Sequence, residues 1–291
     1  MQKIGESELI LNKDGSIFHL HLLPENIADT IILVGDQDRV DMISSYFEKV
    51  EFKVQNREFR THTGYYNKKR ITVLSTGIGT DNIDIVLNEL DAIVNIDLKQ
   101  RVVKKEHKSL NFVRIGTSGA LQEDIPVDTP VISEMAIGFD GLLNFYQNRD
   151  KISNLEMEKE FTEYVNWNDK LAKPYFVKAS EQLLKKVGGT DMRKGLTISA
   201  PGFYAPQGRL LRLPTVDPEL NSKISKFTYQ TKKITNFEME SSAIYGLSKL
   251  LGHNAVTVCN IIANRIRKEY SADYKIAMEK LVVKILDRLT S

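Results

Sequence analysis

Residues 71–94 read ITVLSTGIGTDNIDIVLNELDAIV, and this stretch decides the fold. The apolar, partly β-branched run Ile71–Ser75 predicts a buried strand, and a loop with two glycines follows it. Apolar residues then recur at helical spacing, after Asp81 as the expected N-cap, at Ile83, Val86, Leu87, Leu90, Ile93 and Val94. A strand, a loop and an amphipathic helix in this order are typical of an α/β domain.

The same alternation continues along the chain. Five more apolar runs predict strands at Thr30–Val34, Phe112–Ile115, Pro130–Ser133, Leu196–Ala200 and Ala255–Ala263. Two more amphipathic patterns predict helices, one with Met239, Ala243, Leu247 and Leu251 that ends at Gly252, and a closing one with Ile276, Leu281, Ile285 and Leu289. No repeat or linker interrupts the pattern. We therefore expect one α/β domain over residues 1–291, with a central mixed, mostly buried sheet flanked by helices.

Composition restricts the function classes. The 40 Lys and Arg residues nearly balance the 38 Asp and Glu residues, so the net charge gives no reason to expect a nucleic acid or membrane partner. No apolar run approaches the roughly 20 residues of a membrane span. Cys259 is the only cysteine, which excludes an internal disulfide and fits a reducing compartment. We expect a soluble, cytoplasmic protein.

Two arginines near predicted strand ends could bind an anion. Gly35 follows the strand Thr30–Val34, and Arg39 lies in the first turn of the helix after it, where free N–H groups favour an anion. The alternative is a tight turn with a solvated arginine. Arg114 interrupts an apolar strand, and a buried guanidinium needs a partner. That partner could be a phosphate or a nearby carboxylate, and the residues alone leave both open.

Other motifs carry weaker signals. The loop before Asn82 resembles a dinucleotide fingerprint, but its third glycine is missing, which disfavours a dehydrogenase. His19 and His21 would share one face of a strand, yet no third ligand has suitable spacing, so no metal site is predicted. Cys259, within an apolar strand, is expected to be a buried thiol rather than a nucleophile.

Two further segments are ambiguous on their own. Arg57 has the character of an ordinary surface arginine. Glu238 and Glu240 are placed by the pattern at the start of a helix, where acidic residues complement the helix dipole. They could equally accept hydrogen bonds from a sugar diol.

Six blocks taken together are far more specific than any one of them. In order they are VGDQDRV (34–40), NREF (56–59), STGIGTDN (75–82), RIGTSGA (114–120), GFYAPQGR (202–209) and NFEMESSA (236–243). This series resembles the nucleoside phosphorylase family, and within it the members that act on uridine. The likeness runs from about His19 to Arg265. Gln37 replaces the proline of the family's G-D-P-x-R pattern, which leaves Gly35 and Arg39 in place.

The resemblance implies a role for each matching residue. Phosphate would be bound by Gly35, Arg39, Arg114 and Thr117, with Arg57 reaching it from a neighbouring subunit. Ribose would be bound by Glu240 at its 2′ and 3′ hydroxyls, by Met239, and by His19 at its 5′ end across a subunit interface. Uracil would be recognised by Gln207 and Arg209, with Phe203 packed on the base and Arg265 supporting the pair. Of these, Arg114, Gln207 and Arg209 would be catalytic.

The implied reaction is phosphorolysis of uridine to uracil and ribose 1-phosphate, as in pyrimidine nucleoside salvage. Inorganic phosphate would be the nucleophile and co-substrate, with no other cofactor. A homo-oligomer, at least a dimer, would be needed to complete the site, and a hexamer is one size that fits. Some relatives hold a potassium ion between subunits at the places of Glu58, Ile78 and Asn82.

Three alternatives remain open at this stage. A purine nucleoside phosphorylase is one, because Asn260 falls near the place where purine-specific relatives carry an acid. A nucleosidase would use water in place of phosphate and would have no use for three phosphate arginines. A non-catalytic nucleoside-binding protein could use the same ribose and base residues.

Overall fold

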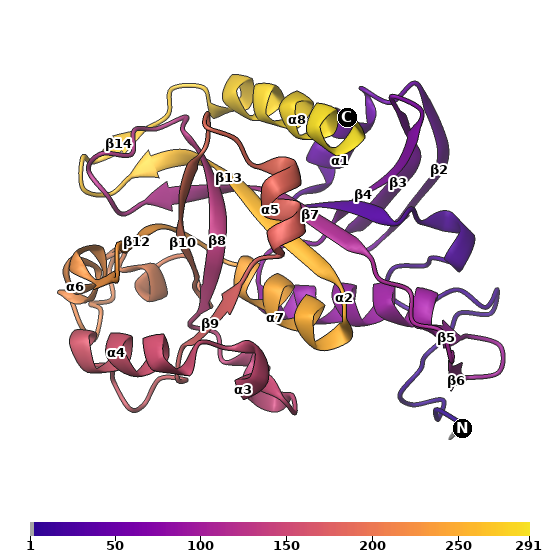
Figure 1. Cartoon of the computed structure of the whole chain (residues 1–291), viewed down its shortest axis with the longest axis horizontal. Helices are drawn as coiled ribbons and strands as arrows, with labels where there is room; N and C mark the ends of the chain where they lie inside the picture. The colour runs from indigo at the N-terminus through magenta and orange to yellow at the C-terminus, as the bar shows by residue number, and fades with distance from the viewer. Residues whose placement is uncertain (1–2) are drawn as a thin grey trace.

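One large sheet organises the protein in the computed structural model, which describes residues 3–291 (Figure 1). Its twelve strands follow the order β11-β12-β10-β8-β13-β7-β1-β4-β3-β2, with β9 paired to β8 and β14 to β13. Parallel pairs such as β1–β4 occur beside antiparallel pairs such as β3–β4. The expected fold class, a single α/β domain with a mixed central sheet, is confirmed.

All six predicted strands are present. The strands of the sheet are β1 (Thr30–Val34), β2 (Lys49–Asn56), β3 (Phe59–Tyr66), β4 (Lys69–Ser75), β7 (Asn111–Ala120), β8 (Pro130–Gly138), β9 (Tyr175–Lys178), β10 (Arg193–Ser199), β11 (Thr228–Tyr229), β12 (Lys232–Glu238), β13 (Asn254–Asn264) and β14 (Glu269–Tyr270). A separate short pair is formed by β5 (Ile96–Asp97) and β6 (Val102–Val103). Residues 116–119, expected as a loop, continue β7, because β13 pairs with them through Ala120.

A second pairing of β7 brings distant segments together. Its end runs antiparallel to β12, with Gly119 opposite Phe237 and Ala120 opposite Asn236. Together with the β12–β10, β10–β8, β8–β13 and β13–β7 pairs, this contact closes five strands into a ring. The end of β12 therefore lies beside β7, although more than a hundred residues separate them in sequence.

Three predicted helices are present among the eight found in residues 3–291. The α-helices are α1 (Gln37–Ser44), α2 (Thr80–Asn95), α3 (Arg149–Ile152), α4 (Leu155–Val165), α5 (Glu181–Val187), α6 (Leu220–Lys226), α7 (Ser241–Leu251) and α8 (Tyr274–Thr290). Short 3₁₀ turns are η1 (Pro24–Asn26), η2 (Leu142–Phe145) and η3 (Ala205–Gln207). Gly252 ends α7 in the left-handed conformation, as predicted.

Two predicted helix starts are wrong. The N-cap of α2 is Gly79, with a φ of 101°, and Asp81 lies inside the first turn. The segment Glu238–Glu240 does not open α7, because Glu238 still pairs in β12 and Glu240 is the N-cap. In both cases tertiary pairing shifts the boundary that periodicity alone suggests.

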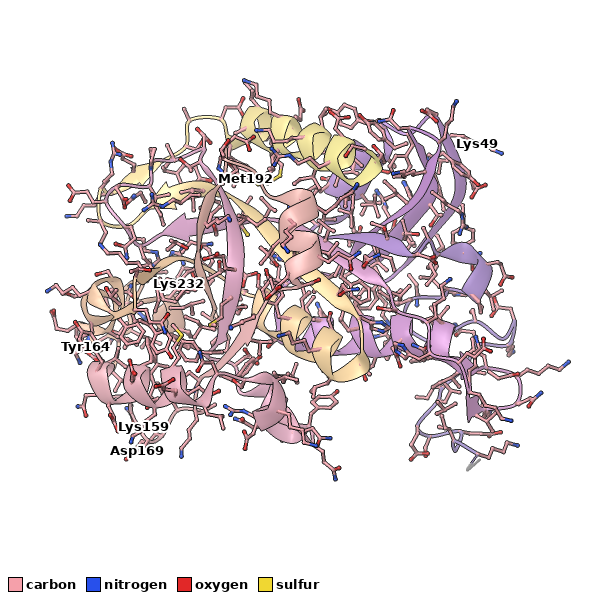
Figure 2. All side chains as sticks on the ribbon, viewed as in Figure 1. Lys49, Lys159, Tyr164, Asp169, Met192 and Lys232 are labelled. Carbon is pink, nitrogen blue, oxygen red and sulfur yellow. The ribbon has the colours of Figure 1, made fainter. Side chains whose placement is uncertain are left out.

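Helices cover both sides of the sheet. In Figure 1, α8 lies on one side of β13 and β7, and α2 and α7 pack together on the other. A strand that is covered by helices on both faces carries mainly apolar side chains on both faces. Ile31, Val113 and Val256, from β1, β7 and β13, are completely buried. Side chains fill the space between the layers, while charged ones such as Lys49 and Lys159 project at the rim (Figure 2). No helix within residues 3–291 has the length and apolar character of a membrane span.

Candidate active site

A cavity of about 480 Å³ opens where β1, β7 and β12 end. Nine of the residues singled out from sequence line it: Gly35, Arg39, Arg114, Thr117, Phe203, Gln207, Arg209, Met239 and Glu240. They come from four separate stretches of the chain, which the fold brings together. Ligand sites of α/β sheets form at strand ends for the same reason.

Arg114 lies at the centre of the buried charges. Its Nε donates to Oε2 of Glu238 over 3.2 Å, and its Nη2 pairs with Oε2 of Glu240. Its Nη1 is buried and has no hydrogen-bond partner among residues 3–291. Burial acts to lower the pKa of Arg114, but Glu240 and Glu238 outweigh it and raise that pKa. The guanidinium is therefore charged, paired on two sides, and still has N–H groups available for an anion.

Gly116 makes room for that guanidinium. A Cβ at Gly116 would lie 3.2 Å from Nη2 of Arg114 and 3.2 Å from Sγ of Cys259 on the neighbouring strand. Burial raises the pKa of Cys259 to about 12, and Glu238 adds to the shift. Cys259 is therefore a buried neutral thiol, as predicted.

Arg39 approaches from the first turn of α1. Asp36 caps the helix by accepting from the backbone N–H of Arg39 over 2.9 Å, and it also pairs with Nη2 over 2.8 Å. Nη1 donates to the carbonyl of Ile115 over 3.3 Å. Burial lowers the pKa of Arg39, and Asp36 opposes that shift. Beside it, a Cβ at Gly35 would meet only the carbonyl oxygen of Gly77, at 3.9 Å. Gly35 and Asp36 line the cavity, so the helix N-terminus is accessible to an anion.

Glu240 lies between the basic residues and the rest of the cavity. Its Oε1 accepts from the backbone N–H of Gly79 over 2.8 Å, and it is almost fully buried. Burial raises its pKa to about 7, with Arg114 opposing and Glu238 adding to the shift. Gly77 and Gly79 have φ of 71° and 101°, values that favour glycine. The two glycines thus shape a loop that holds Glu240, which explains the resemblance to a dinucleotide motif.

Glu238 has a larger role than its sequence position suggests. Besides Arg114, its carboxylate accepts from the hydroxyl of Ser199 and from the backbone N–H groups of Glu240 and Ser241, over 3.0 and 2.9 Å. It therefore fixes both the arginine and the start of α7. From the sequence, Glu238 was expected either to start a helix or to accept hydrogen bonds from a sugar diol, and its role in holding Arg114 was missed.

Gln207 holds the other end of the cavity. Its Oε1 accepts from Nη1 of Arg209 over 2.6 Å and from Nη2 of Arg265 over 2.9 Å, and Arg265 also donates to its carbonyl. The guanidinium of Arg209 lies 3.6 Å from the centre of the Phe203 ring. Because both arginines donate to the amide oxygen of Gln207, its Nε2 group remains available as a donor to a ligand. Arg265 supports the pair without lining the cavity itself.

These two arginines lack acidic partners. Neither Arg209 nor Arg265 forms an ion pair with a carboxylate in the part of the chain that the structure describes. Burial lowers the pKa of both, and repulsion from Arg209 helps to lower that of Arg265 to about 10. Two partly desolvated cations without a counter-charge favour a ligand that is, or becomes, negative.

The walls of this end are apolar. Ile262 and Ala263 from β13 and Tyr270 from β14 face the cavity together with Phe237. Sequence reasoning missed them, because an apolar residue in a strand shows no sign of whether it meets the core or a ligand.

The comparisons with known proteins agree with this arrangement. Residues 29–290 match the model of the Phosphorylase superfamily. The chain belongs to this family. A protein of Thermococcus kodakarensis named uridine phosphorylase is 29% identical over 276 residues, which cover 93% of this chain and 85% of that protein.

Other relatives cover similar lengths of this phosphorylase. A uridine phosphorylase of Haemophilus influenzae is 28% identical over 257 residues, covering 87% of this chain and 88% of the relative. A DeoD-type purine nucleoside phosphorylase of Listeria welshimeri is 25% identical over 244 residues, covering 84% and 85%. Among solved structures, a Trypanosoma brucei nucleoside phosphorylase described as having uridine phosphorylase activity superposes with a TM-score of 0.88 at 29% identity, covering 97% and 99%.

Two predicted site residues of the phosphorylase lie outside its own cavity. His19 sits in a turn, where Nδ2 of Asn56 donates to its carbonyl over 2.8 Å. Arg57 follows Asn56 at the tip of the β2–β3 hairpin, with a φ of 54°. His19 and His21 do not share the face of a strand, because His19 lies in a turn and His21 has a φ of 54° and pairs with Asp14 over 3.0 Å.

Asn260 also faces away from the cavity. Its Nδ2 lies 3.4 Å from Oδ1 of Asp128, and its side chain lines a different hollow beside α8. In a regular strand Asn260 and the cavity-lining Ile262 would share one face. The register of β13 against β7 shifts between Ile261 and Ala263, so the two side chains line different hollows. The expectation that Asn260 stands near the base is therefore wrong.

The residues of the possible potassium site gather around Gly77. Glu58 and Asn82 both pack against the place where a Gly77 side chain would stand. Nδ2 of Asn82 points to the carbonyl of Ile78 over 3.5 Å. The potassium ion at a subunit interface stays a prediction.

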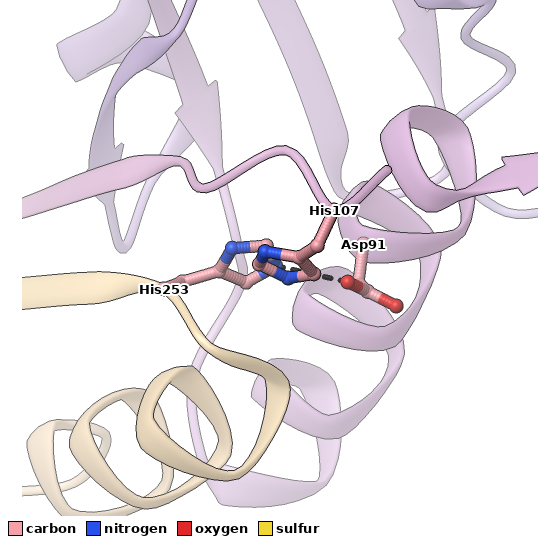
Figure 3. A group of neighbouring side chains, drawn as sticks. All are labelled: Asp91, His107 and His253. Atoms are coloured by element: carbon pink, nitrogen blue, oxygen red, sulfur yellow. Dashed lines mark ion pairs between the residues drawn. The ribbon is translucent and has the colours of Figure 1, made fainter. Parts of the chain in front are cut away.

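A second cluster, Asp91, His107 and His253, has a structural explanation (Figure 3). Nδ1 of His253 accepts from the backbone N–H of Leu110 over 3.1 Å, so its neutral ring carries the proton on Nε2. That Nε2 lies 3.1 Å from Oδ1 of Asp91, where its N–H is attracted to the carboxylate although it is too poorly aligned for a good hydrogen bond. A protonated Nε2 is a poor metal ligand, and His107 is occupied by the carbonyl of Leu251 over 2.8 Å.

Proposed function

We propose that this phosphorylase cleaves uridine with inorganic phosphate, giving uracil and ribose 1-phosphate, as in pyrimidine nucleoside salvage. The observation that carries the proposal is the arrangement of the charged and polar side chains around the cavity. Arg39 and Arg114 lie at one end, Glu240 lies between, and Gln207 with Arg209 lies at the other end without a carboxylate. Phosphate, ribose and a base that leaves as an anion require groups in this order.

At the phosphate end, the nucleophile is held by groups already in place. Phosphate would take the unused Nη1 of Arg114, the Arg39 guanidinium, the start of α1 near Gly35, and the hydroxyl of Thr117. One phosphate oxygen then attacks C1′ as the bond from C1′ to N1 of uracil breaks, and that bonding pair leaves on the base. Positioning of the nucleophile can remove several kcal/mol of the barrier.

At the ribose and base end, the same cavity stabilises the leaving group. Glu240 accepts hydrogen bonds from the 2′ and 3′ hydroxyls, and Met239 packs against the sugar. The Nε2 group of Gln207 and the guanidinium of Arg209 donate to the uracil carbonyls, while Phe203 packs on the base. Each such donor contributes about 3 kcal/mol when charge grows on the acceptor.

The geometry favours a pyrimidine over a purine. Purine leaving groups are helped by an acid that protonates the ring. The acidic residues that line the cavity are Asp36, Glu238 and Glu240, all held at the phosphate and ribose end. Asn260, which kept the purine alternative open, faces Asp128 instead.

We also propose that residues 1–291 act as one domain in the cytoplasm, in a homo-oligomer of at least two copies, such as a dimer or a hexamer. His19 and Arg57 are tied to one another through Asn56 and lie outside their own cavity. In the assembly they would complete the site of a neighbouring copy. Phosphate is the only co-substrate that the proposal needs.

The experiment follows uridine absorbance with purified protein, with and without inorganic phosphate, and with inosine in parallel. Loss of uridine only in the presence of phosphate is the expected result. Cleavage of inosine alone would make the protein a purine nucleoside phosphorylase, and cleavage without phosphate would make it a nucleosidase. Tight uridine binding without cleavage would identify a binding protein.

A further inference from the structure

The carboxylate of Glu89 holds the His19 turn with four contacts. Glu89 lies on α2, and its oxygens accept from the backbone N–H of His19 over 3.0 Å and from that of Leu20 over 2.8 Å. Oε1 also lies 2.6 Å from Nδ1 of the His19 ring. The side chain of Glu89 is only 13% exposed, so these contacts are shielded from water. One carboxylate thus fixes both the backbone and the ring of this turn.

These contacts settle which nitrogen of His19 is available. An ionised carboxylate only accepts hydrogen bonds, so the ring must carry its proton on Nδ1. Nε2 then has no hydrogen-bond partner within residues 3–291, and the His19 side chain is 28% exposed. In the neutral ring Nε2 is an acceptor, and a hydroxyl can donate to it. Phe18 packs edge-on against the ring, with centroids 4.8 Å apart, and restricts its rotation further.

The turn cannot serve the cavity of its own chain. Helix α2 begins after Gly79, which holds Glu240 of that cavity, and Glu89 lies ten residues further along. At 1.5 Å per residue, the helix separates His19 from Glu240 by about 15 Å. The same rigid helix therefore positions the ribose acceptor of one site and presents His19 elsewhere.

We propose that Glu89 is a positioning residue that fixes His19 with Nε2 free to accept from the ribose 5′ hydroxyl in the site of a neighbouring copy. This inference rests on the proposed function and adds a determinant of sugar specificity to it. Glu89 itself touches no substrate. Its effect is on the tautomer and the direction of the His19 ring.

The test compares kcat/KM for uridine and for 5′-deoxyuridine at saturating phosphate. The wild-type protein is expected to prefer uridine by about tenfold, the worth of one good hydrogen bond. Glu89→Gln, Glu89→Ala and His19→Ala should remove the preference, mainly through a higher KM for uridine, and leave 5′-deoxyuridine within about twofold. Adding Glu89→Ala to His19→Ala should change the preference no further.

Asp91→Asn is the matched control, because it removes a carboxylate from the same helix and from a similar contact with a histidine, His253. It should keep the preference for uridine. An equal loss for both nucleosides in the Glu89 variants, or a preference that survives in them, would overturn the positioning role. Cleavage of neither nucleoside by the wild-type protein would overturn the proposed function itself, and this inference with it.

A second measurement does not depend on turnover. Nitrogen-15 NMR of the five histidines should show the proton of neutral His19 on Nδ1 in the wild-type protein. Glu89→Gln should shift His19 toward the other tautomer while His253 keeps its own. A His19 ring protonated on Nε2 in the wild-type protein would contradict the proposal.

Discussion

Arg114 and Glu240 form a buried ion pair, so the group placed for phosphate and the group placed for ribose hold one another in position. Both side chains are less than 6% exposed. Each is also anchored elsewhere, Arg114 on Glu238 and Glu240 on the backbone of Gly79. Loss of either partner should therefore disturb both halves of the site.

Arg114→Ala should abolish phosphorolysis and also weaken the fold. The substitution leaves Glu238 and Glu240 buried without their cation, which typically costs about 3–5 kcal/mol of stability. Arg114→Lys keeps the charge and should fold, with a higher KM for phosphate. Thermal unfolding and phosphate kinetics measure the two effects. Arg193→Ala, which removes an exposed pair with Asp124, is the control and should change neither by much. Normal phosphate kinetics in both Arg114 variants would refute the phosphate assignment.

Uridine binding should depend on pH through Glu240. Burial raises the pKa of this residue to about 7, so the carboxylate that accepts from the ribose diol is lost as the pH falls below that value. We expect KM for uridine to rise below about pH 7 and to show no such inflection in Glu240→Gln. An inflection that persists unchanged in the variant would assign it to another group.

The raised pKa of Glu240 also makes the stability of the folded protein depend on pH. The folded state keeps a proton on Glu240 up to about pH 7, whereas the ordinary pKa is 4.5. Between these values the folded state binds more protons, so this residue makes the free energy of unfolding fall as the pH rises. Urea unfolding across that range should show a steeper decline for the wild-type protein than for Glu240→Gln. Parallel curves would contradict the buried position of the acid.

Gln207→Glu should separate stability from activity. A carboxylate at this place would pair with Arg209 and Arg265, both of which now share one amide oxygen, so the fold should be kept or strengthened. The variant loses the Nε2 donor and neutralises the cations that stabilise the leaving base. We expect kcat/KM for uridine to fall by at least about 100-fold, as for the loss of one donor to a developing charge. Retained activity would show that Gln207 does not contact the base.

Asn260→Asp tests the purine alternative. Because Asn260 faces Asp128 and not the cavity, an acid there cannot reach a base. The variant should cleave uridine within about threefold of the wild-type rate, although two facing carboxylates should reduce its thermal stability. New cleavage of inosine would show that this side chain does reach the base.

Much of the fold could be predicted from periodicity. The strands β1, β4, β7, β8, β10 and β13 are apolar on both faces because helices cover both sides of the sheet, and such runs stand out in the sequence. The hairpin strands β2 and β3 were missed, since β2 is half exposed and rich in charge. The end of β7 was mistaken for a loop because of its two glycines, of which Gly116 makes room for Arg114 and Gly119 lies beside Arg265, and neither forms a turn.

The site could be predicted only in part, for a physical reason. Single arginines and glutamates gave ambiguous signals, because a charge near a strand end suits water as well as a ligand. The antiparallel contact of β12 with β7 brings Glu238 and Arg114 together, and no local pattern encodes a contact across so many residues. Asn260 was misplaced because β13 has an irregularity between Ile261 and Ala263, which separates its direction from that of the cavity-lining Ile262 and which no local pattern shows.

The most direct test of the central claim identifies the sugar product. Phosphorus-31 NMR of a mixture of protein, uridine and inorganic phosphate should show ribose 1-phosphate appearing in step with uracil. Free ribose with unchanged phosphate, or no conversion of uridine at all, would contradict the account.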